Sequence, residues 1–191
     1  MTNQFADQLL KTLEDQVEDH VNDPVKIFQN LSPQQLLKPA TNGGWSIAQC
    51  LWHLNSYGDY YLPKIKSGLI KKYPANPDIK STWLGSYFTR MMKPGAQMKK
   101  YKAFKNHIPP VQLEADKVVA KFIHQQEQLL SPWKQAWNTD LNRVHIPIFI
   151  LGWMKLKLGD VFLFIIAHNE RRFQQAKRNL TLQCLANLVI L

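Results

Sequence analysis

The chain has 191 residues, of which 45% are hydrophobic and 20% charged, values typical of one globular domain rather than of a disordered chain. Its formal net charge is +10, and the excess lies in residues 64–105, which carry 11 basic residues and one acid, Asp78. No apolar stretch reaches the roughly 18 residues that a membrane span needs, and the N-terminus does not resemble a signal peptide. We therefore expect residues 1–191 to form one cytoplasmic domain that is not bound to a membrane.

Both cysteines, Cys50 and Cys184, fall within helical patterns, and neither belongs to a Cys-x-x-Cys pair. A zinc ribbon or a redox motif is therefore not expected. We predict that both are buried, reduced thiols, which fits a reducing compartment.

Apolar residues at three- and four-residue spacing predict a first main helix over about 4–22, with acidic residues on its outer face. Asp23-Pro24 and Ser32-Pro33 each join a capping residue to a proline, and proline suits the first position of a helix. We therefore expect the chain to restart at each of these pairs with a short helical segment.

Ser46 can cap a second main helix over about 46–66, which Pro63 should kink or end. A long connection over 67–110 follows, and prolines and glycines interrupt it repeatedly. It contains one short helical pattern, Thr82–Met92. A connection of this length is unusual in a compact domain, so we expect it to be functional or to form a lid.

A third main helix is predicted over about 112–130, with Pro132 at its end. Residues 141–156 are interpreted as an extended loop rather than a strand, because Pro147 interrupts them and no partner strand is evident. The last main helix covers about 160–180, after a Gly-Asp cap. The pattern therefore predicts an all-α bundle of four main helices.

Histidines stand in two of these helices. The sequence Gly44-Trp45-Ser46-Ile47-Ala48-Gln49 opens the second main helix, and His53-Leu54 follows it. The last main helix carries His168-Asn169-Glu170-Arg171, with Gln174 and Gln175 after it. Without further information, His53 and His168 would be two histidines hydrogen-bonded within the bundle. His20, His107, His124 and His145 have no partner at ligand spacing, and we expect them to be structural or exposed.

Together with the turn Leu31-Ser32-Pro33-Gln34-Gln35-Leu36, these motifs resemble the DinB/YfiT-like superfamily of small bacterial four-helix bundles. The resemblance spans most of residues 5–180. It implies a divalent-metal site, usually zinc or nickel, with one histidine from the second helix and two from the last helix at i and i+4. Two histidines four apart share a helical face and reach one ion, and a third leaves room for water or substrate.

On this resemblance His53 and His168 are the candidate ligands, and Tyr57 and Gln49 would line the pocket. The third ligand is missing, because Arg172 stands where the family has histidine. Arginine stays protonated and cannot bind a metal ion. Arg172 either belongs to a basic run near the helix end or converts the pocket into a site for an anion. Its spacing from His168 favours the pocket.

Three functions stay open. The first is a metal-dependent hydrolase or thiol transferase, as some relatives are, with the metal activating a water or a thiol. The second is a non-catalytic bundle whose His53, His168 and Arg172 bind a small anionic ligand. The third, ranked last because no nucleic-acid motif is present, is binding of nucleic acid or an acidic partner by residues 64–105, which are otherwise a solvated loop. The apolar tail over 182–190 suggests a homodimer.

Classical covalent catalysis has no support in the sequence, which contains no Ser-His-Asp order, glycine-rich phosphate loop or His-Glu-x-x-His motif. Cys50 lies three residues before His53, so a cysteine nucleophile is conceivable. A buried core thiol is the preferred interpretation.

Overall fold

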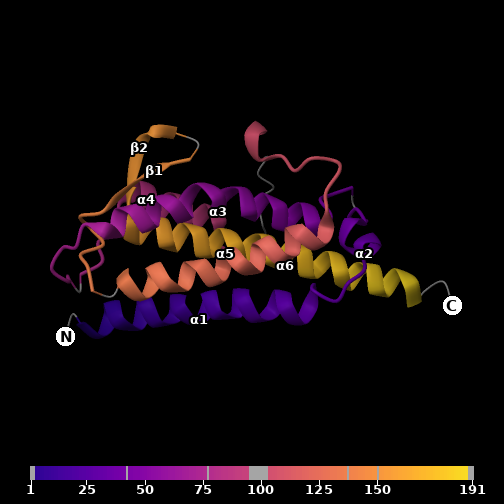
Figure 1. The fold of residues 1–191 in the computed structure, drawn as a ribbon, viewed down its shortest axis with the longest axis horizontal. Helices are drawn as coiled ribbons and strands as arrows, with labels where there is room; N and C mark the ends of the chain where they lie inside the picture. The colour runs from indigo at the N-terminus through magenta and orange to yellow at the C-terminus, as the bar shows by residue number, and fades with distance from the viewer. Residues whose placement is uncertain are drawn as a thin grey trace.

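The computed structural model describes residues 3–41, 43–76, 78–94, 103–136, 138–149 and 151–188, without the side chains of 3–10, 13, 133 and 186–188. Four long helices lie side by side along the long axis of the molecule (Figure 1). They are α1 (Asn3–Ile27), α3 (Ile47–Ile70), α5 (Ala115–Ala136) and α6 (Leu158–Leu188). The shorter elements are α2 (Pro33–Leu37), α4 (Trp83–Met92), the 3-10 turn η1 (Lys105–His107), and the strands β1 (His145–Ile148) and β2 (Leu151–Lys157). The predicted all-α four-helix bundle is thus confirmed.

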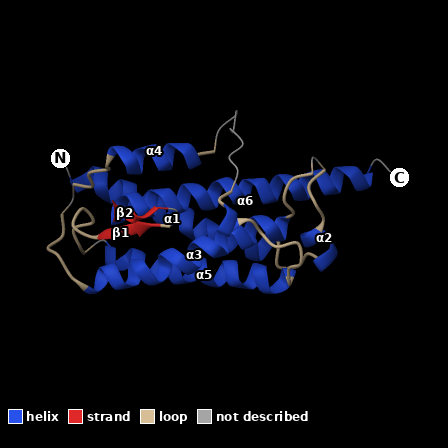
Figure 2. Ribbon diagram, turned by 90° about the horizontal axis from the view of Figure 1, so that it is seen from above, coloured by secondary structure: helices blue, strands red, loops and turns tan. Residues whose placement is uncertain are grey.

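The connection between α3 and α5 sets the topology of the bundle. It returns the chain along the molecule, so α3 and α5 run in the same direction (Figure 1). α3 packs against α5 and α6, and α1 packs against the same two helices. Figure 2 shows α4, which belongs to this connection, lying along the outside of α6.

Serine caps start two of the helices as predicted. The Ser46 hydroxyl accepts the Gln49 backbone N–H at 3.2 Å, and the Gln49 side-chain oxygen accepts the Ser46 backbone N–H at 3.0 Å. Ser32 and Gln35 form the same capping box at α2. Each box satisfies two donors that a helix start would otherwise leave unpaired.

Prolines end the long helices less often than the sequence suggested. α1 continues through Pro24 and α5 through Pro132, so the predicted ends at these two positions are wrong. α3 also continues through Pro63, so this proline does not end the helix, which was one of the two effects expected of it. An internal proline removes one helical hydrogen bond and costs roughly 3 kcal/mol. Burial of the following apolar residues offsets this cost; in α3, Ile65 is 0% and Leu69 5% exposed.

The interpretation of 141–156 as a strandless loop is also wrong. β1 and β2 form an antiparallel hairpin in which Pro147 is paired with Lys155 and the register shifts just after the proline. Both strands of a two-stranded sheet are edges, so the missing N–H of Pro147 need not break a ladder. The partner of β1 is β2, the strand that follows it directly in the chain.

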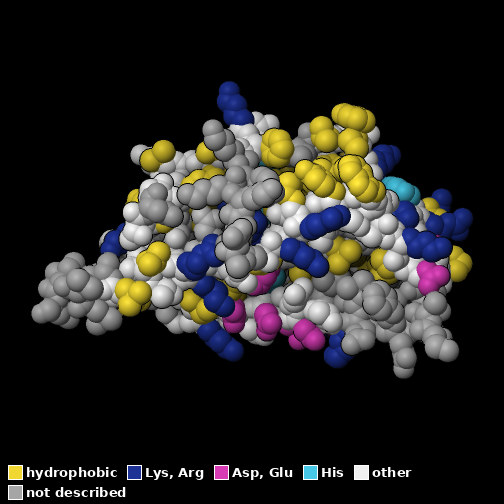
Figure 3. Space-filling view, turned by 180° about the vertical axis from the view of Figure 1, so that it is seen from behind, with side chains coloured by type: hydrophobic (Ala, Val, Ile, Leu, Met, Phe, Trp, Pro, Cys, Tyr) yellow, Lys and Arg dark blue, Asp and Glu magenta, His cyan; other side chains and the backbone are white. Residues whose placement is uncertain are grey.

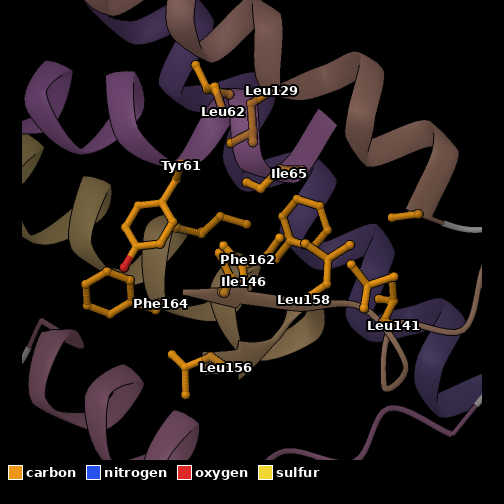
Figure 4. Close-up of a cluster of buried hydrophobic side chains, with 14 of the residues drawn as sticks. Tyr61, Leu62, Ile65, Leu129, Leu141, Ile146, Leu156, Leu158, Phe162 and Phe164 are labelled. Atoms are coloured by element: carbon orange, nitrogen blue, oxygen red, sulfur yellow. The ribbon is translucent and has the colours of Figure 1, made fainter. Parts of the chain in front are cut away.

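The interior holds two clusters of buried apolar side chains. Figure 4 shows the larger one, which contains Ile146 and Leu156 from the hairpin, Phe162 of α6 and Ile65 of α3. The second cluster surrounds Phe28, Leu51, Phe122 and Phe173. Because α3 and α6 contribute to both, residues midway along these two helices lie where the clusters meet.

The Gly-Asp pair before the last helix does not cap it. α6 already begins at Leu158, and the buried carboxylate of Asp160 accepts hydrogen bonds from the start of α4 instead. Cys50 is buried as predicted, but Cys184 is exposed, so that expectation is wrong. Val189 and Ile190 of the apolar tail lie outside the described residues.

Within the described ranges, no helix is both long and apolar enough to cross a lipid bilayer.

Candidate functional site

The site is centred on two histidines that face each other from antiparallel helices. Nε2 of His53 on α3 lies 3.1 Å from Nε2 of His168 on α6. Both side chains are buried, and their rings are nearly perpendicular at a centroid separation of 5.0 Å. The two residues that the sequence singled out therefore lie in direct contact.

A third histidine joins them from the long connection. Nδ1 of His53 donates to the backbone carbonyl of His107 at 2.8 Å, and His107 is itself buried. The Ser56 hydroxyl donates to the carbonyl of His53 at 2.7 Å and lies 2.8 Å from Nδ1 of His107. His107 stands in a segment without helical periodicity, so no spacing in the sequence connected it with the site.

The hydrogen bonds assign the protons of the facing pair. A carbonyl can only accept, so Nδ1 of His53 carries the proton. A neutral imidazole has one N–H, so Nε2 of His53 accepts and Nε2 of His168 donates. Burial, helped by the charge of Arg172, lowers the pKa of His53 to about 3. Burial first, and then the neighbouring His53, holds the pKa of His168 well below its usual value, so both rings are neutral at pH 7.

Arg172 lies beside this pair and not in a surface run of basic residues. Its guanidinium carbon is 4.7 Å from the centre of the Trp45 ring, and that ring is 5.0 Å from the ring of His53. Nη1 of Arg172 donates to the side-chain oxygen of Gln175 at 2.9 Å, whereas its Nε is buried with no acceptor. Burial lowers the pKa of Arg172. Among the described side chains, no carboxylate forms an ion pair with it.

Three further residues, Tyr57, Gln49 and Cys50, were considered for the site from the sequence, and each has different contacts. The Tyr57 ring packs 4.5 Å from the ring of His168 and 4.6 Å from that of His107, and burial raises its pKa to about 12. Gln49 uses its side-chain oxygen at the helix start. Burial raises the pKa of Cys50 to about 12, so this thiol stays protonated at pH 7, which favours the buried core thiol over a nucleophile.

The donor set meets only part of what a divalent metal requires. The 3.1 Å between the two Nε2 atoms is close to the roughly 3.3 Å between two ligands of one tetrahedral zinc ion. However, the described part of the chain contains no group of three or more His, Cys, Asp or Glu side chains arranged to hold an ion. The position four residues after His168 carries a permanent cation. Two imidazoles and a guanidinium do not fit a resident zinc or nickel ion.

Comparison with known proteins supports the resemblance stated from the sequence. The family model of the DinB superfamily matches residues 8–176. The structure of YfiT from Bacillus subtilis, described as a probable metal-dependent hydrolase with an unusual four-helix bundle topology, matches with a TM-score of 0.53 and 14% identity over 91% of this chain and 85% of that one. A search of the curated proteins finds no match. At this identity the structural match shows a shared fold.

Proposed function

Because the chain belongs to the DinB superfamily, we propose that its central site is a divergent form of a histidine metal site, in which a small anion replaces the metal ion. The ligand is a carboxylate or a phosphate, and the protein binds it without covalent chemistry. One observation carries this proposal: Nε of Arg172 is buried and has no acceptor.

The charge of Arg172 supports an anionic ligand. A guanidinium cannot lose its proton at accessible pH, and a buried charge without a partner is destabilising. Nη1 is engaged by Gln175, which leaves the edge formed by Nε and Nη2. Two parallel N–H groups on one edge match the two oxygens of a carboxylate or phosphate. Arg172 and Trp45 are only partly buried as residues, so the guanidinium lies near the surface although its Nε is itself buried.

The two histidines couple ligand binding to protons. In the free site both rings are neutral, and the charge of Arg172 contributes to their low pKa values. A bound anion offsets that charge and raises both pKa values, so affinity should increase as the pH falls.

The competing function is metal-dependent hydrolysis, which is how YfiT is described. Two observations favour it here: the short distance between the two Nε2 atoms, and the carbonyl of His107 that fixes the proton of His53 on Nδ1. A histidine that binds a metal through Nε2 commonly donates its other N–H in this way. Arg172 distinguishes the two functions, because it supports an anion and opposes a cation.

Protein without a histidine tag should be tested by elemental analysis and by calorimetry with acetate and inorganic phosphate. We expect no stoichiometric metal and anion binding in the millimolar range, about −4 kcal/mol. Arg172→Gln should weaken binding at least about tenfold, since a charged hydrogen-bonding group is lost. Arg178→Gln, on the exposed face of the same helix, is the control and should bind like the wild type.

One equivalent of zinc or nickel that is lost in His53→Ala would overturn the proposal and establish the metal site. So would anion binding that is unchanged in Arg172→Gln. Arg172→His restores histidines at i and i+4 on α6, and we expect this variant to gain zinc binding that also requires His53.

A further inference from the structure

A separate surface of the protein displays large aromatic rings to solvent. Trp83 and Tyr87 occupy successive turns of α4 and are 78% and 48% exposed. Their rings are stacked, with centroids 5.9 Å apart and planes 19° from parallel. Trp153, on the neighbouring strand β2, is 82% exposed. Exposed apolar surface of this kind commonly marks a binding site.

Unpaired cations border these rings. Lys157 Nζ donates to the carbonyl of Lys80 at 2.9 Å, which places the end of β2 beside the residue three before Trp83. Arg90 follows Tyr87 by three residues and therefore lies on the same face of α4. In the described ranges, none of these three basic residues forms an ion pair with a carboxylate. We call Lys80, Trp83, Tyr87, Arg90 and Lys157 the α4 platform.

The same combination is visible on one face of this end of the molecule. Figure 3 shows the face opposite to that of Figure 1, and hydrophobic side chains gather beside Lys and Arg at the end that carries α4 and the hairpin. Residues 64–105, which include most of the platform, hold the excess positive charge of the chain. The partner of this surface should therefore be anionic and should offer flat groups for the rings.

We infer that the α4 platform binds single-stranded nucleic acid, with bases stacked on Trp83 and Tyr87 and phosphates bound by the basic side chains. Aromatic rings on a positively charged surface are the usual means of binding single strands without sequence preference. From the sequence alone, nucleic-acid binding ranks last among the three functions, because no recognised nucleic-acid motif is present. The exposure and stacking of the two rings are the new observations.

An anionic membrane is the other partner that such charges attract, and α4 is poorly suited to it. Membrane-surface helices insert aliphatic and aromatic side chains from one face. Of the aliphatic side chains of α4, Leu84 and Met92 pack against the bundle interior, and Met91 is half-buried. Its exposed residues are the two aromatics and Arg90. The outward face thus favours stacking over insertion.

The platform is also held in place before any ligand binds. The carboxylate of Asp160 on α6 accepts from the Thr82 backbone N–H at 3.0 Å and from its hydroxyl at 2.7 Å, and the Ser81 hydroxyl also donates to it. Asp160 is only 1% exposed, so these charged hydrogen bonds lie out of water. A rigid platform loses less conformational entropy when a strand binds.

Fluorescence anisotropy with labelled oligothymidine and oligouridine of about 12 nucleotides tests the inference. We expect binding that weakens as salt rises from about 50 to 200 mM. The double variant Trp83→Ala/Tyr87→Ala should bind at least about tenfold more weakly, since one or two stacked bases are lost. Lys80→Gln/Lys157→Gln should reduce the slope of log affinity against log salt by about 1.4, about 0.7 for each lost phosphate contact.

The matched control is Lys38→Gln/Arg178→Gln, which removes the same charge from exposed positions at the other end of the bundle. This control should change the affinity for the oligonucleotides much less than Lys80→Gln/Lys157→Gln does. Circular dichroism should show every variant folded, because none of the substituted side chains is buried.

Three outcomes would overturn the inference: no salt-sensitive binding of either oligonucleotide, equal affinity in the aromatic double variant, or equal losses in the platform and control variants. Vesicles of phosphatidylserine and phosphatidylcholine provide a further test. Binding to these vesicles that depends on Trp83 and Tyr87, without oligonucleotide binding, would show that the partner is a membrane.

Discussion

Nε2 of His53 and Nε2 of His168 share one proton across 3.1 Å, and this contact joins α3 to α6 in the interior of the bundle. It is lost when both rings are protonated, because two protonated imidazoles would each offer a donor and no acceptor. The contact therefore links the stability of the fold to pH.

The free energy of unfolding should fall as the pH is lowered from 7 to 5. Burial lowers the folded pKa of His53 to about 3 and that of His168 well below its usual value, so the unfolded chain takes up protons below about 6.5 that the folded chain does not. Each such histidine contributes at most about 1.4 kcal/mol per pH unit. Urea denaturation at several pH values measures the slope. His53→Gln should reduce it, and an unchanged slope would show that the pair does not titrate as described.

Arg172→Met should raise the free energy of unfolding by about 1 kcal/mol while abolishing anion binding. Nε of Arg172 is buried without an acceptor, and an apolar side chain of similar length removes that uncompensated charge. Thermal and urea denaturation in a buffer of low anion concentration give the comparison. A marked loss of stability would instead mean that Arg172 is mainly structural, through its contact with Trp45.

Asp160→Ala should loosen α4 while leaving the four-helix bundle folded. The substitution removes the acceptor for Thr82 and Ser81, and we expect a loss of about 1–3 kcal/mol. Hydrogen exchange should show faster exchange in α4 than in α3. Asp116→Ala, at an exposed position in the first turn of α5, is the control. Equal protection of α4 in both variants would contradict the anchoring role.

Ser56→Ala should weaken the attachment of the segment around His107 to α3. The hydroxyl of Ser56 lies within hydrogen-bonding distance of Nδ1 of His107, and its loss leaves a buried ring nitrogen without that partner at a cost of about 1–3 kcal/mol. Limited proteolysis should therefore cut residues 103–114 faster than in the wild type. Ser86→Ala, on α4, serves as a control for loss of a serine hydroxyl elsewhere. Equal rates of cleavage within 103–114 in the two variants would contradict the role of Ser56 in holding this segment.

Local rules predicted the fold where they agreed with tertiary packing. Ser46 starts α3 because its cap and the following apolar stripe point to the same structure. Pro63 shows the opposite case, since a local helix breaker lies in a helix whose next turns bury Ile65 and Leu69. The strength of that burial depends on distant residues, which a local pattern does not contain.

The candidate site, too, could be predicted only where its residues lie on regular helices. His53 and His168 lie on the inner faces of regular helices, so their meeting follows from periodicity and from the bundle itself. His107 lies in a connection whose path no periodicity specifies. The contacts of Arg172 with Trp45 and Gln175 depend on side-chain conformation, and the helical register shows only on which face Arg172 lies.

The carbonyl of His107 has an influence that reaches beyond its own segment. By accepting from Nδ1 of His53, it keeps the basic nitrogen of that ring turned toward α6. If the connection shifted by about one bond length, the proton would be free to migrate to Nε2, and the basic edge of the ring would turn away from His168. The backbone of this connection therefore determines which ring nitrogen of a buried histidine carries the proton.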